Sequence, residues 1–219
     1  IAELQTRMAI EAAEAPDRIA LQAEALAEPL AVAVHAVAIG RRAFAGLFAT
    51  AKVAVIGGGA IGLATALVLV SEGAREVLLV ETNPARRATA EAASDKIRAI
   101  APDEEPDRGN YDLIFDAVGA AATREMAFRM ARRGGVIVHS GLLPGSEGVD
   151  VRALTLRELA FLGAYCYTIQ DFRHAIALLA SGALGPLNWI ETRPLADGSK
   201  AFADIDAGQV AAAKIVLTA

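Results

Sequence analysis

The sequence predicts an α/β fold in which helices cover both faces of a doubly wound parallel sheet. Short apolar runs rich in Val, Leu and Ile recur at residues 51–56, 77–80, 112–117 and 136–138, and longer helical patterns separate them. The apolar residues within each run are consecutive rather than at every second position, as expected for strands buried on both faces. The 219 residues are 54% hydrophobic but only 5% aromatic, so aliphatic side chains must fill the core.

The first expected helix begins at Pro29, where a missing N–H costs nothing, and ends at Gly40. Residues 53–70 then carry no charge over 18 positions, which is near the lower length limit of a membrane-spanning helix. The glycine cluster of residues 57–62 is costly in a helix and natural in a turn. We therefore predict a strand over residues 51–56 and a helix over residues 60–71, and no membrane span.

The remaining elements follow in the same alternation. Asn83 is the expected N-cap of a helix that reaches about residue 100, and an acidic loop follows at residues 102–110. A helix is predicted over residues 123–131, and Gly134 and Gly135 form the turn before the next strand. A further strand over residues 159–165, a helix over residues 171–180 ending at Gly182, and a last strand over residues 214–217 complete the chain.

The charge and cysteine content restrict the partners. A net charge of −5 argues against nucleic acid or an anionic membrane as the main partner. Cys166 is the single cysteine, so the chain forms neither an internal disulfide nor a cysteine-rich zinc site, which fits a cytoplasmic protein. We expect Cys166 to be a small buried apolar residue rather than a nucleophile.

The main chemical signal is the sequence Val-Ile-Gly-Gly-Gly-Ala-Ile-Gly that ends at Gly62. Gly57, Gly59 and Gly62 fit the spacing G-x-G-x-x-G. The first glycine permits a tight exit from the strand, the second lets a diphosphate approach the backbone, and the third lets the helix pack closely. The helix N-terminus, with Ala60 and Ile61, would then point its N–H groups at the phosphates.

Glu81 ends the next strand, 19 residues after Gly62, where a carboxylate accepts hydrogen bonds from the adenosine ribose hydroxyls. A carboxylate there repels a 2′-phosphate and favours NAD over NADP. The alternative is a solvated acid at a strand end. Arg86 is expected to cover the adenine, or else to be a surface arginine with Arg87 in the first turn of a helix.

Two more strand ends should meet in the same crevice, because ligands bind at the carboxyl ends of such strands. Asp116 is expected to cap the turn that follows it rather than to contact a ligand. His139 has no partner acid identifiable by spacing, so we assign it no catalytic role. His174, within a predicted helix, is expected to be solvated.

Taken together, these segments resemble the cofactor-binding half of the zinc-containing medium-chain alcohol and polyol dehydrogenases, including the sorbitol and threonine dehydrogenase branches. The resemblance runs from about residue 25 to 217. It is carried by the glycine motif and by the sequences Leu-Ala-Glu-Pro-Leu at 26–30, Glu-Thr-Asn at 81–83, Asp-Ala-Val-Gly at 116–119, Arg-Gly-Gly at 133–135 and Ala-Ser-Gly at 180–182.

The resemblance implies a Rossmann domain over residues 28–165, after a residual segment 1–27, with residues 166–219 returning toward a catalytic domain. It implies an NAD-dependent dehydrogenase with an alcohol or polyol as substrate, and a homo-oligomer (dimer or tetramer) joined along the strand near residues 159–165. Val118, Ser140, Gly141 and Leu142 would line the nicotinamide side, and Glu28 matches an acid that approaches or ligates a catalytic zinc in some members.

One departure from the family is large. The family's cysteine and histidine zinc ligands precede the position of Glu28, and residues 1–27 contain neither residue type. We therefore expect a truncated or partial enzyme whose catalytic residues are unknown and whose zinc belongs to the full-length protein. The alternatives are a zinc-free reductase of the same superfamily and a non-catalytic NAD-binding module.

Overall fold

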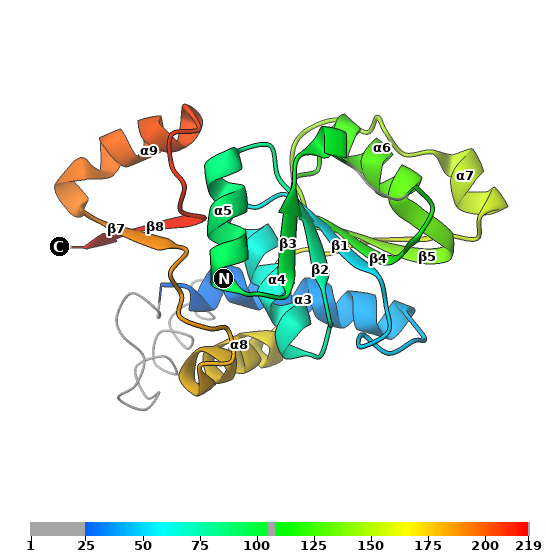
Figure 1. Ribbon diagram of the computed structural model, residues 1–219, viewed down its shortest axis with the longest axis horizontal. Helices are drawn as coiled ribbons and strands as arrows, with labels where there is room; N and C mark the ends of the chain where they lie inside the picture. The colour runs from blue at the N-terminus through cyan, green and yellow to red at the C-terminus, as the bar shows by residue number, and fades with distance from the viewer. Residues whose placement is uncertain (1–24, 105–107, 219) are drawn as a thin grey trace.

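A parallel six-stranded sheet forms the centre of the molecule, in the strand order β3-β2-β1-β4-β5-β6 (Figure 1). We describe it from a computed structural model that covers residues 25–104 and 108–218. The strands are β1 (Val53–Ile56), β2 (Val77–Val80), β3 (Ile97–Ile100), β4 (Tyr111–Asp116), β5 (Ala131–His139) and β6 (Ala160–Gly163). The strand order reverses between β1 and β4, so the predicted doubly wound fold is confirmed.

Helices cover both faces of the sheet. One face carries α3 (Ala27–Ala43), α4 (Ala60–Ser71), α5 (Pro84–Ala93) and α8 (Ile169–Ser181), and the other carries α6 (Ala121–Met130) and α7 (Val151–Leu156). Alternate strand residues face the two layers: Val53 and Val55 pack in the first core, and Ala54 and Ile56 pack in the second. Every residue of β1 and β2 is buried, which explains their unbroken apolar sequences.

The charge-free stretch of residues 53–70 is the strand β1 and the helix α4, as predicted, and α4 has the predicted bounds. Among the helices that the structure describes, none has both the length and the apolar character needed to cross a bilayer.

The first helix, α3, does not end at Gly40 as predicted but continues to Ala43. A Cβ atom at Gly40 would lie 2.9 Å from Cζ of Phe115 and 3.3 Å from Cδ1 of Leu113. Gly40 is therefore the point where the helix lies closest to β4, and its small size serves packing rather than termination.

The helix after β2 is shorter than predicted. Asn83 caps it as expected, because its Oδ1 accepts from the N–H of Ala85 at 2.9 Å, but the helix ends at Ala93. Residues 97–100, assigned to this helix from the sequence, form β3, which pairs in parallel with β2. Only Ile97 and Ile100 are buried in β3, so this edge strand lacks the continuous apolar run that identified the other strands.

The glycine pair at residues 134–135 lies inside β5 rather than in a turn before it. Tyr111 pairs with Ala131, but Leu113 pairs with Val136, so the register shifts and β5 bulges. Gly134 has a φ of 68°, which suits glycine in such a bulge.

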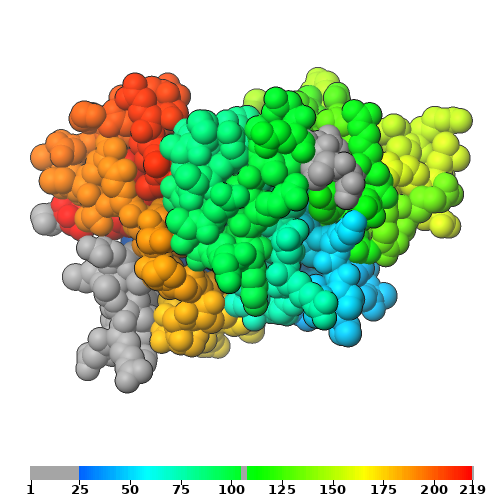
Figure 2. Space-filling view, viewed as in Figure 1, coloured from blue at the N-terminus to red at the C-terminus, as the bar shows by residue number. Residues whose placement is uncertain are grey.

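The C-terminal residues add a second, two-stranded parallel sheet that the sequence predicted only in part. Its strands are β7 (Ile190–Pro194) and the expected β8 (Lys214–Thr218), and α9 (Gly198–Asp206) lies between them. Gly182 ends α8 in the left-handed conformation, as predicted. The space-filling view shows this C-terminal unit lying against α5 (Figure 2).

Candidate functional site

A cleft of about 360 Å³ opens at the carboxyl ends of β1, β2 and β4. It lies where the strand order reverses, which is the position at which open α/β sheets bind ligands. Its walls include Ile56, Gly57, Val80, Glu81, Val118 and Thr123. The structure thus brings three sequence-predicted residues (Gly57, Glu81 and Val118) to one cleft.

The three motif glycines have distinct geometric roles. Gly57 has a φ of 101° and donates its N–H to the carbonyl of Val80 at 2.8 Å, which makes the tight exit from β1. A Cβ at Gly62 would lie 1.8 Å from the carbonyl oxygen of Gly57, so only glycine lets α4 start so close to the loop. A Cβ at Gly59 would meet nothing within 4 Å, so open space lies beside its Cα.

The start of α4 can bind an anion. Gly59 is the N-cap of α4, and no side chain caps the helix there. The N–H groups of Ala60, Ile61 and Gly62 have no partner within the helix, as in any first turn, and no acidic side chain neutralises that turn. The open space at Gly59 and these N–H groups form a cradle that fits a diphosphate.

Glu81 is buried, with 7% of its surface exposed, and is fixed by three hydrogen bonds. Its Oε2 accepts from the N–H of Gly58 at 2.7 Å, and its Oε1 accepts from the N–H of Asn83 at 2.8 Å and the hydroxyl of Thr82 at 3.0 Å. The alternative of a solvated acid is therefore wrong. The carboxylate lines the cleft and also holds the glycine loop.

The middle glycine, Gly58, has a role that the motif spacing does not reveal. A Cβ there would lie 3.0 Å from Cγ and from Oε2 of Glu81. The carboxylate reaches the Gly58 N–H only because that position carries no side chain.

Arg86 and Arg87 hold backbone rather than lining the cleft. Arg86 donates from Nε to the carbonyl of Val210 at 3.3 Å, and Arg87 donates from Nη1 to the carbonyls of Glu81 at 2.8 Å and Thr82 at 2.9 Å. The side-chain amide of Asn83 also donates from Nδ2 to the carbonyl of Gly208 at 2.7 Å. The loop before β8 is thereby fixed beside the start of α5, a long-range contact without a sequence signal.

Asp116 is fully buried and organises the turn after β4. Its Oδ1 accepts from the N–H groups of Val118 and Gly119, both at 3.0 Å, and its Oδ2 accepts from the Thr123 hydroxyl at 3.1 Å. The predicted capping role is confirmed. The same Oδ2 lies 3.1 Å from Nδ1 of His139, so the structure supplies the partner acid that spacing did not identify.

The loops after β4 and β5 touch each other at two glycines. A Cβ at Gly141 would lie 2.1 Å from the carbonyl carbon of Val118, and one at Gly119 would lie 2.5 Å from that of Gly141. Ser140 and Gly141 both donate their N–H groups to the carbonyl of Asp116, at 2.9 and 3.1 Å. Val118, Ser140 and Gly141 are thus brought together, whereas the next residue, Leu142, is 76% exposed.

Arg124 is a residue of this region that the sequence analysis missed. It is 3% exposed, and it donates from Nη1 to the carbonyl of Gly119 and from Nε to the carbonyl of Glu147. Its Nη2 is buried and has no hydrogen-bond partner. A buried guanidinium therefore ties the loop after β5 to the turn after β4, and nothing in an exposed-looking Thr-Arg-Glu sequence indicated its burial.

The predicted zinc-side acid, Glu28, is exposed in the first turn of α3. Partial burial, and then the negative charges of Glu28 and Cys166, raise the pKa of Tyr167. Within residues 25–104 and 108–218, no three His, Cys, Asp or Glu side chains gather where they could hold a metal ion. These residues therefore do not fit a zinc ion by themselves.

The other two candidates differ in outcome. Cys166 is exposed, with a left-handed φ of 53°, so the prediction of a buried apolar residue is wrong. It lies shortly after β6, where the chain leaves the sheet. The surrounding apolar sequence did not indicate that the side chain would be exposed. His174 is exposed on α8, as predicted.

Comparison with known proteins gives a consistent result. A family model described as zinc-binding dehydrogenase matches residues 60–181. The 2-dehydro-3-deoxy-L-galactonate 5-dehydrogenase of Pseudoalteromonas atlantica is 33% identical over 201 residues, and the match covers 87% of this chain and 57% of that enzyme.

Two solved structures have the same fold. Acetophenone reductase from Geotrichum candidum NBRC 4597, in complex with NAD, superposes with a TM-score of 0.82 at 22% identity, over 94% of this chain and 58% of that one. A protein of Sinorhizobium meliloti 1021, classed as a zinc-binding dehydrogenase and bound to NADP, gives 0.72 at 28% identity, over 83% and 56%. The chain spans little more than half the length of these proteins.

Proposed function

The chain belongs to the zinc-binding dehydrogenase family, and we propose that it is the cofactor-binding part of an NAD-dependent oxidoreductase that transfers hydride between an alcohol or polyol and the nicotinamide. The observation that carries the proposal is the cradle at Gly59, where open space meets an uncapped helix start. The polyol-type substrate is supported by the 2-dehydro-3-deoxy-L-galactonate 5-dehydrogenase relative.

We propose a counterpart in the chain for each part of the cofactor. The N–H groups at the start of α4 would bind the diphosphate, and Glu81 would accept hydrogen bonds from the adenosine ribose. Val118, Ser140 and Gly141, held by Asp116, would position the nicotinamide. NAD supplies the redox chemistry when bound, and these residues bind and orient it. We propose Arg86 and Leu142 as outer contacts on the adenine and nicotinamide sides.

We propose NAD rather than NADP as the cofactor, although one of the similar structures holds NADP. Glu81 is buried and keeps its carboxylate at the end of β2, where it would repel a 2′-phosphate. Competing titrations should show that NADH binds at least about tenfold more tightly than NADPH, which corresponds to about 1.4 kcal/mol. Equal affinity for the two would overturn the assignment of Glu81.

The variant Gly59→Ala tests the cradle directly. The added methyl group meets nothing in the protein, so the variant should fold normally, but it takes up space that the diphosphate needs. The diphosphate would lose hydrogen bonds from the start of α4. A calorimetric titration should therefore show NADH binding weakened by about tenfold or more. The control is Gly198→Ala, at the start of α9, where a Cβ would meet only the Leu217 side chain, at 3.3 Å. Unchanged affinity in Gly59→Ala would contradict the proposed function.

We propose that the catalytic zinc is held by ligands in an N-terminal domain of a longer protein, with Glu28 as an acid that approaches it. The proposal rests on the family and on the absence of a metal-binding cluster from the described residues. A zinc-free reductase and a non-catalytic NAD-binding module are the alternatives. Turnover of an alcohol by this chain alone, with NAD and with or without Zn²⁺, would contradict our account, whereas NADH binding without turnover supports it.

We further propose the division of the chain at about residues 28 and 166. The core of residues 28–165 is built around the six-stranded sheet, and β7 and β8 form a separate sheet. The first helix of residues 166–219, α8, nevertheless packs on α3 through Phe172, Ala175 and Leu178. The segment 1–27 lies outside the described residues except for its last three.

The proposed homo-oligomer, a dimer or a tetramer, would form along β6. This strand is the last one in the six-stranded sheet, so one of its edges is available for pairing. Sedimentation equilibrium measures the assembly directly, and a monomer at all concentrations would contradict the proposal. We also propose a cytoplasmic location, because the single cysteine of the chain suits a reducing compartment.

A further inference from the structure

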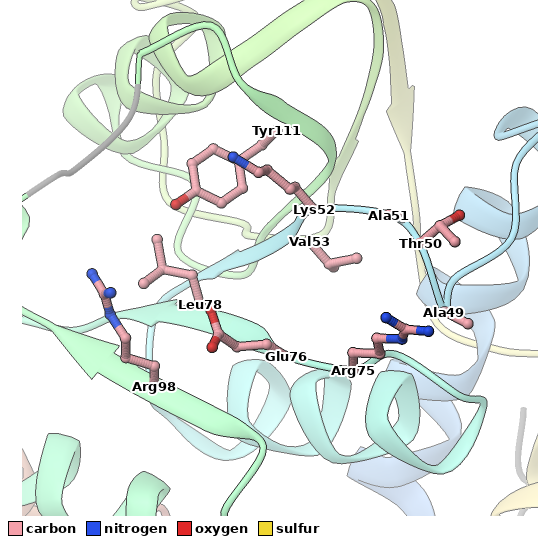
Figure 3. A pocket seen from close by; sticks show the side chains of 10 residues that line it. All are labelled: Ala49, Thr50, Ala51, Lys52, Val53, Arg75, Glu76, Leu78, Arg98 and Tyr111. Carbon is pink, nitrogen blue, oxygen red and sulfur yellow. The ribbon is translucent and has the colours of Figure 1, made fainter.

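A second cleft opens at the opposite edge of the sheet and plays no part in the function proposed above. Its volume is about 410 Å³, which is within the range of small-molecule sites. Val53, Leu78, Arg98 and Tyr111 line it, and each lies at or next to the first residue of its strand (Figure 3). Because all four strands are parallel, this cleft lies at their amino ends, away from the glycine loop.

The charged side chains of this amino-edge cleft are three cations and one carboxylate, in a chain whose net charge is −5. Lys52 precedes β1, Arg75 and Glu76 precede β2, and Arg98 belongs to β3. Arg75 and Arg98 are exposed, and within the described residues neither guanidinium makes a hydrogen bond or an ion pair. The strand order places Arg98 on the β3 side and Lys52 on the β1 side, so cations approach the cleft from two sides (Figure 3).

The charged rim surrounds a floor that includes buried apolar side chains. Val53 and Leu78 are buried at 2% and 4% exposure, and the ring of Tyr111 is 7% exposed. These side chains close the floor of the cleft, and a ligand there would place its charged groups near the arginines at the rim. An anion relieves the repulsion between the guanidinium groups of Arg75 and Arg98, and the gain is larger for a ligand with more than one negative group.

We propose that the amino-edge cleft binds a small organic polyanion, with Arg75 and Arg98 pairing with separate negative groups and the carbon skeleton spanning the cleft between them. The negative groups are phosphates or carboxylates, which share this recognition chemistry. Glu76 disfavours negative charge at the centre of the ligand and favours hydroxyl groups there.

Calorimetric titrations with fructose 1,6-bisphosphate and with citrate test the proposal and distinguish the two anions. They are run at saturating NADH, which occupies the glycine loop and removes it as a competing anion site. Saturable binding of either probe supports the proposal, and the probe that binds identifies phosphate or carboxylate. Binding should weaken as ionic strength rises, because both arginines are exposed.

The variants Arg75→Gln and Arg98→Gln should each weaken binding about threefold, and the double variant about tenfold, as expected for exposed ion pairs. The matched control is Arg152→Gln, an exposed arginine on α7 far along the chain from the cleft. An absence of saturable binding by both probes, an unchanged affinity in the double variant, or an equal loss in Arg152→Gln would each overturn the proposal. NADH affinity stays unchanged in all four variants, so failure here is distinct from failure of the proposed function.

Discussion

Charged side chains are buried and hydrogen-bonded at the carboxyl edge of the sheet, whereas two arginines at the amino edge are exposed and without partners within the described residues. At the carboxyl edge Glu81, Asp116 and Arg124 are at most 7% exposed, and each is hydrogen-bonded to backbone groups of the surrounding loops. At the amino edge Arg75 and Arg98 are exposed, and within the described residues their side chains have no partner. Burying a charge is costly unless hydrogen bonds compensate. The buried charges of the carboxyl edge therefore fix the loops around them, whereas the exposed arginines of the amino edge fix none of the described loops.

The same difference applies to the backbone. At the carboxyl edge Gly57 lies against Val118, and Gly119 lies against Gly141, so an added methyl group at any of these glycines would clash. Loops whose backbones pack this closely are preorganised, and binding a ligand beside them requires little reordering. The comparison predicts that substituting a buried charge or a closely packed glycine at the carboxyl edge changes both stability and binding, whereas substituting an exposed arginine at the amino edge changes only ligand binding.

The largest effect is expected for Asp116→Ala. It leaves the N–H groups of Val118 and Gly119 and the Thr123 hydroxyl without their buried acceptor, which costs about 4 kcal/mol of the free energy of unfolding. Urea denaturation followed by circular dichroism measures the loss. Asp116→Asn is the matched control, because it keeps one acceptor oxygen and should lose clearly less. Equal stability of Asp116→Ala and the original chain would contradict the inference that the buried charges of the carboxyl edge stabilise the fold.

Gly62→Ala should follow, with a loss of about 3 kcal/mol and of NADH binding. Its Cβ would lie 1.8 Å from a backbone oxygen, which no side-chain rotation relieves, so α4 must move away from the loop. Gly59→Ala provides the contrast, because it should keep the urea midpoint and lose only affinity. If Gly62→Ala were as stable as Gly59→Ala, the close packing of α4 would not matter to the fold.

Arg124→Met should cost about 2 kcal/mol, because the carbonyls of Gly119 and Glu147 lose their buried donor. The loops on the nicotinamide side would loosen while the start of α4 stays in place. NADH binding should then weaken about fivefold, or about 1 kcal/mol, and AMP binding should not change. Arg152→Met, on the exposed surface of α7, is the control. Equal weakening of AMP and NADH would show that Arg124 acts on the whole site.

The sequence predicted best where a single local pattern determines the structure. The buried strands β1 and β2 carry continuous apolar runs, and Asn83 and Gly182 cap helices through local hydrogen bonds and backbone conformation. The strand-turn-helix structure of the glycine motif was predictable for the same reason, since Gly57 and Gly62 each answer a steric demand at the loop and Gly59 leaves open space beside its Cα.

The failures concern contacts between segments that are distant in sequence. The sequence predicts a helix end at Gly40, because the packing of this residue on Phe115 involves the distant strand β4. It predicts helix rather than strand at β3, because an edge strand buries few residues. The His139–Asp116 pair and the burial of Arg124 arise only when the ends of β4 and β5 meet. Propensity and periodicity describe neighbours in the chain, so such contacts have no signal in them.

Asp171, which lies away from both edges, tests whether hydrogen bonds compensate for the burial of a charge elsewhere in the molecule. Asp171, on α8, accepts three hydrogen bonds at Oδ2: from the Thr168 N–H at 2.8 Å, the Thr168 hydroxyl at 2.7 Å and Nδ1 of His35 at 2.8 Å. Burial alone would raise the pKa of Asp171, but the hydrogen bonds from Thr168, followed by the interaction with His35, lower it overall.

A lowered pKa in the folded state means that the unfolded state binds more protons as the pH falls. The stabilisation from Asp171 is therefore fully present above the unfolded pKa of about 4 and is lost as the pH falls through the lower folded value. Asp171→Asn removes this titration, so its loss of urea-midpoint stability relative to the original chain should shrink below about pH 4. A loss that stays constant from pH 6 to pH 3 would show that the charge of Asp171 contributes nothing.

The smallest effect on stability is expected for Arg98→Gln at the amino edge. Its guanidinium is exposed and makes no ion pair within the described residues, so the free energy of unfolding should change by less than about 0.5 kcal/mol. The urea midpoint of this variant, compared with that of Arg124→Met, measures the difference between the edges for the same residue type. If Arg98→Gln lowered the free energy of unfolding as much as Arg124→Met, exposure would not distinguish the two edges. Arg98 would then stabilise the sheet, and it would not be a side chain available to a ligand.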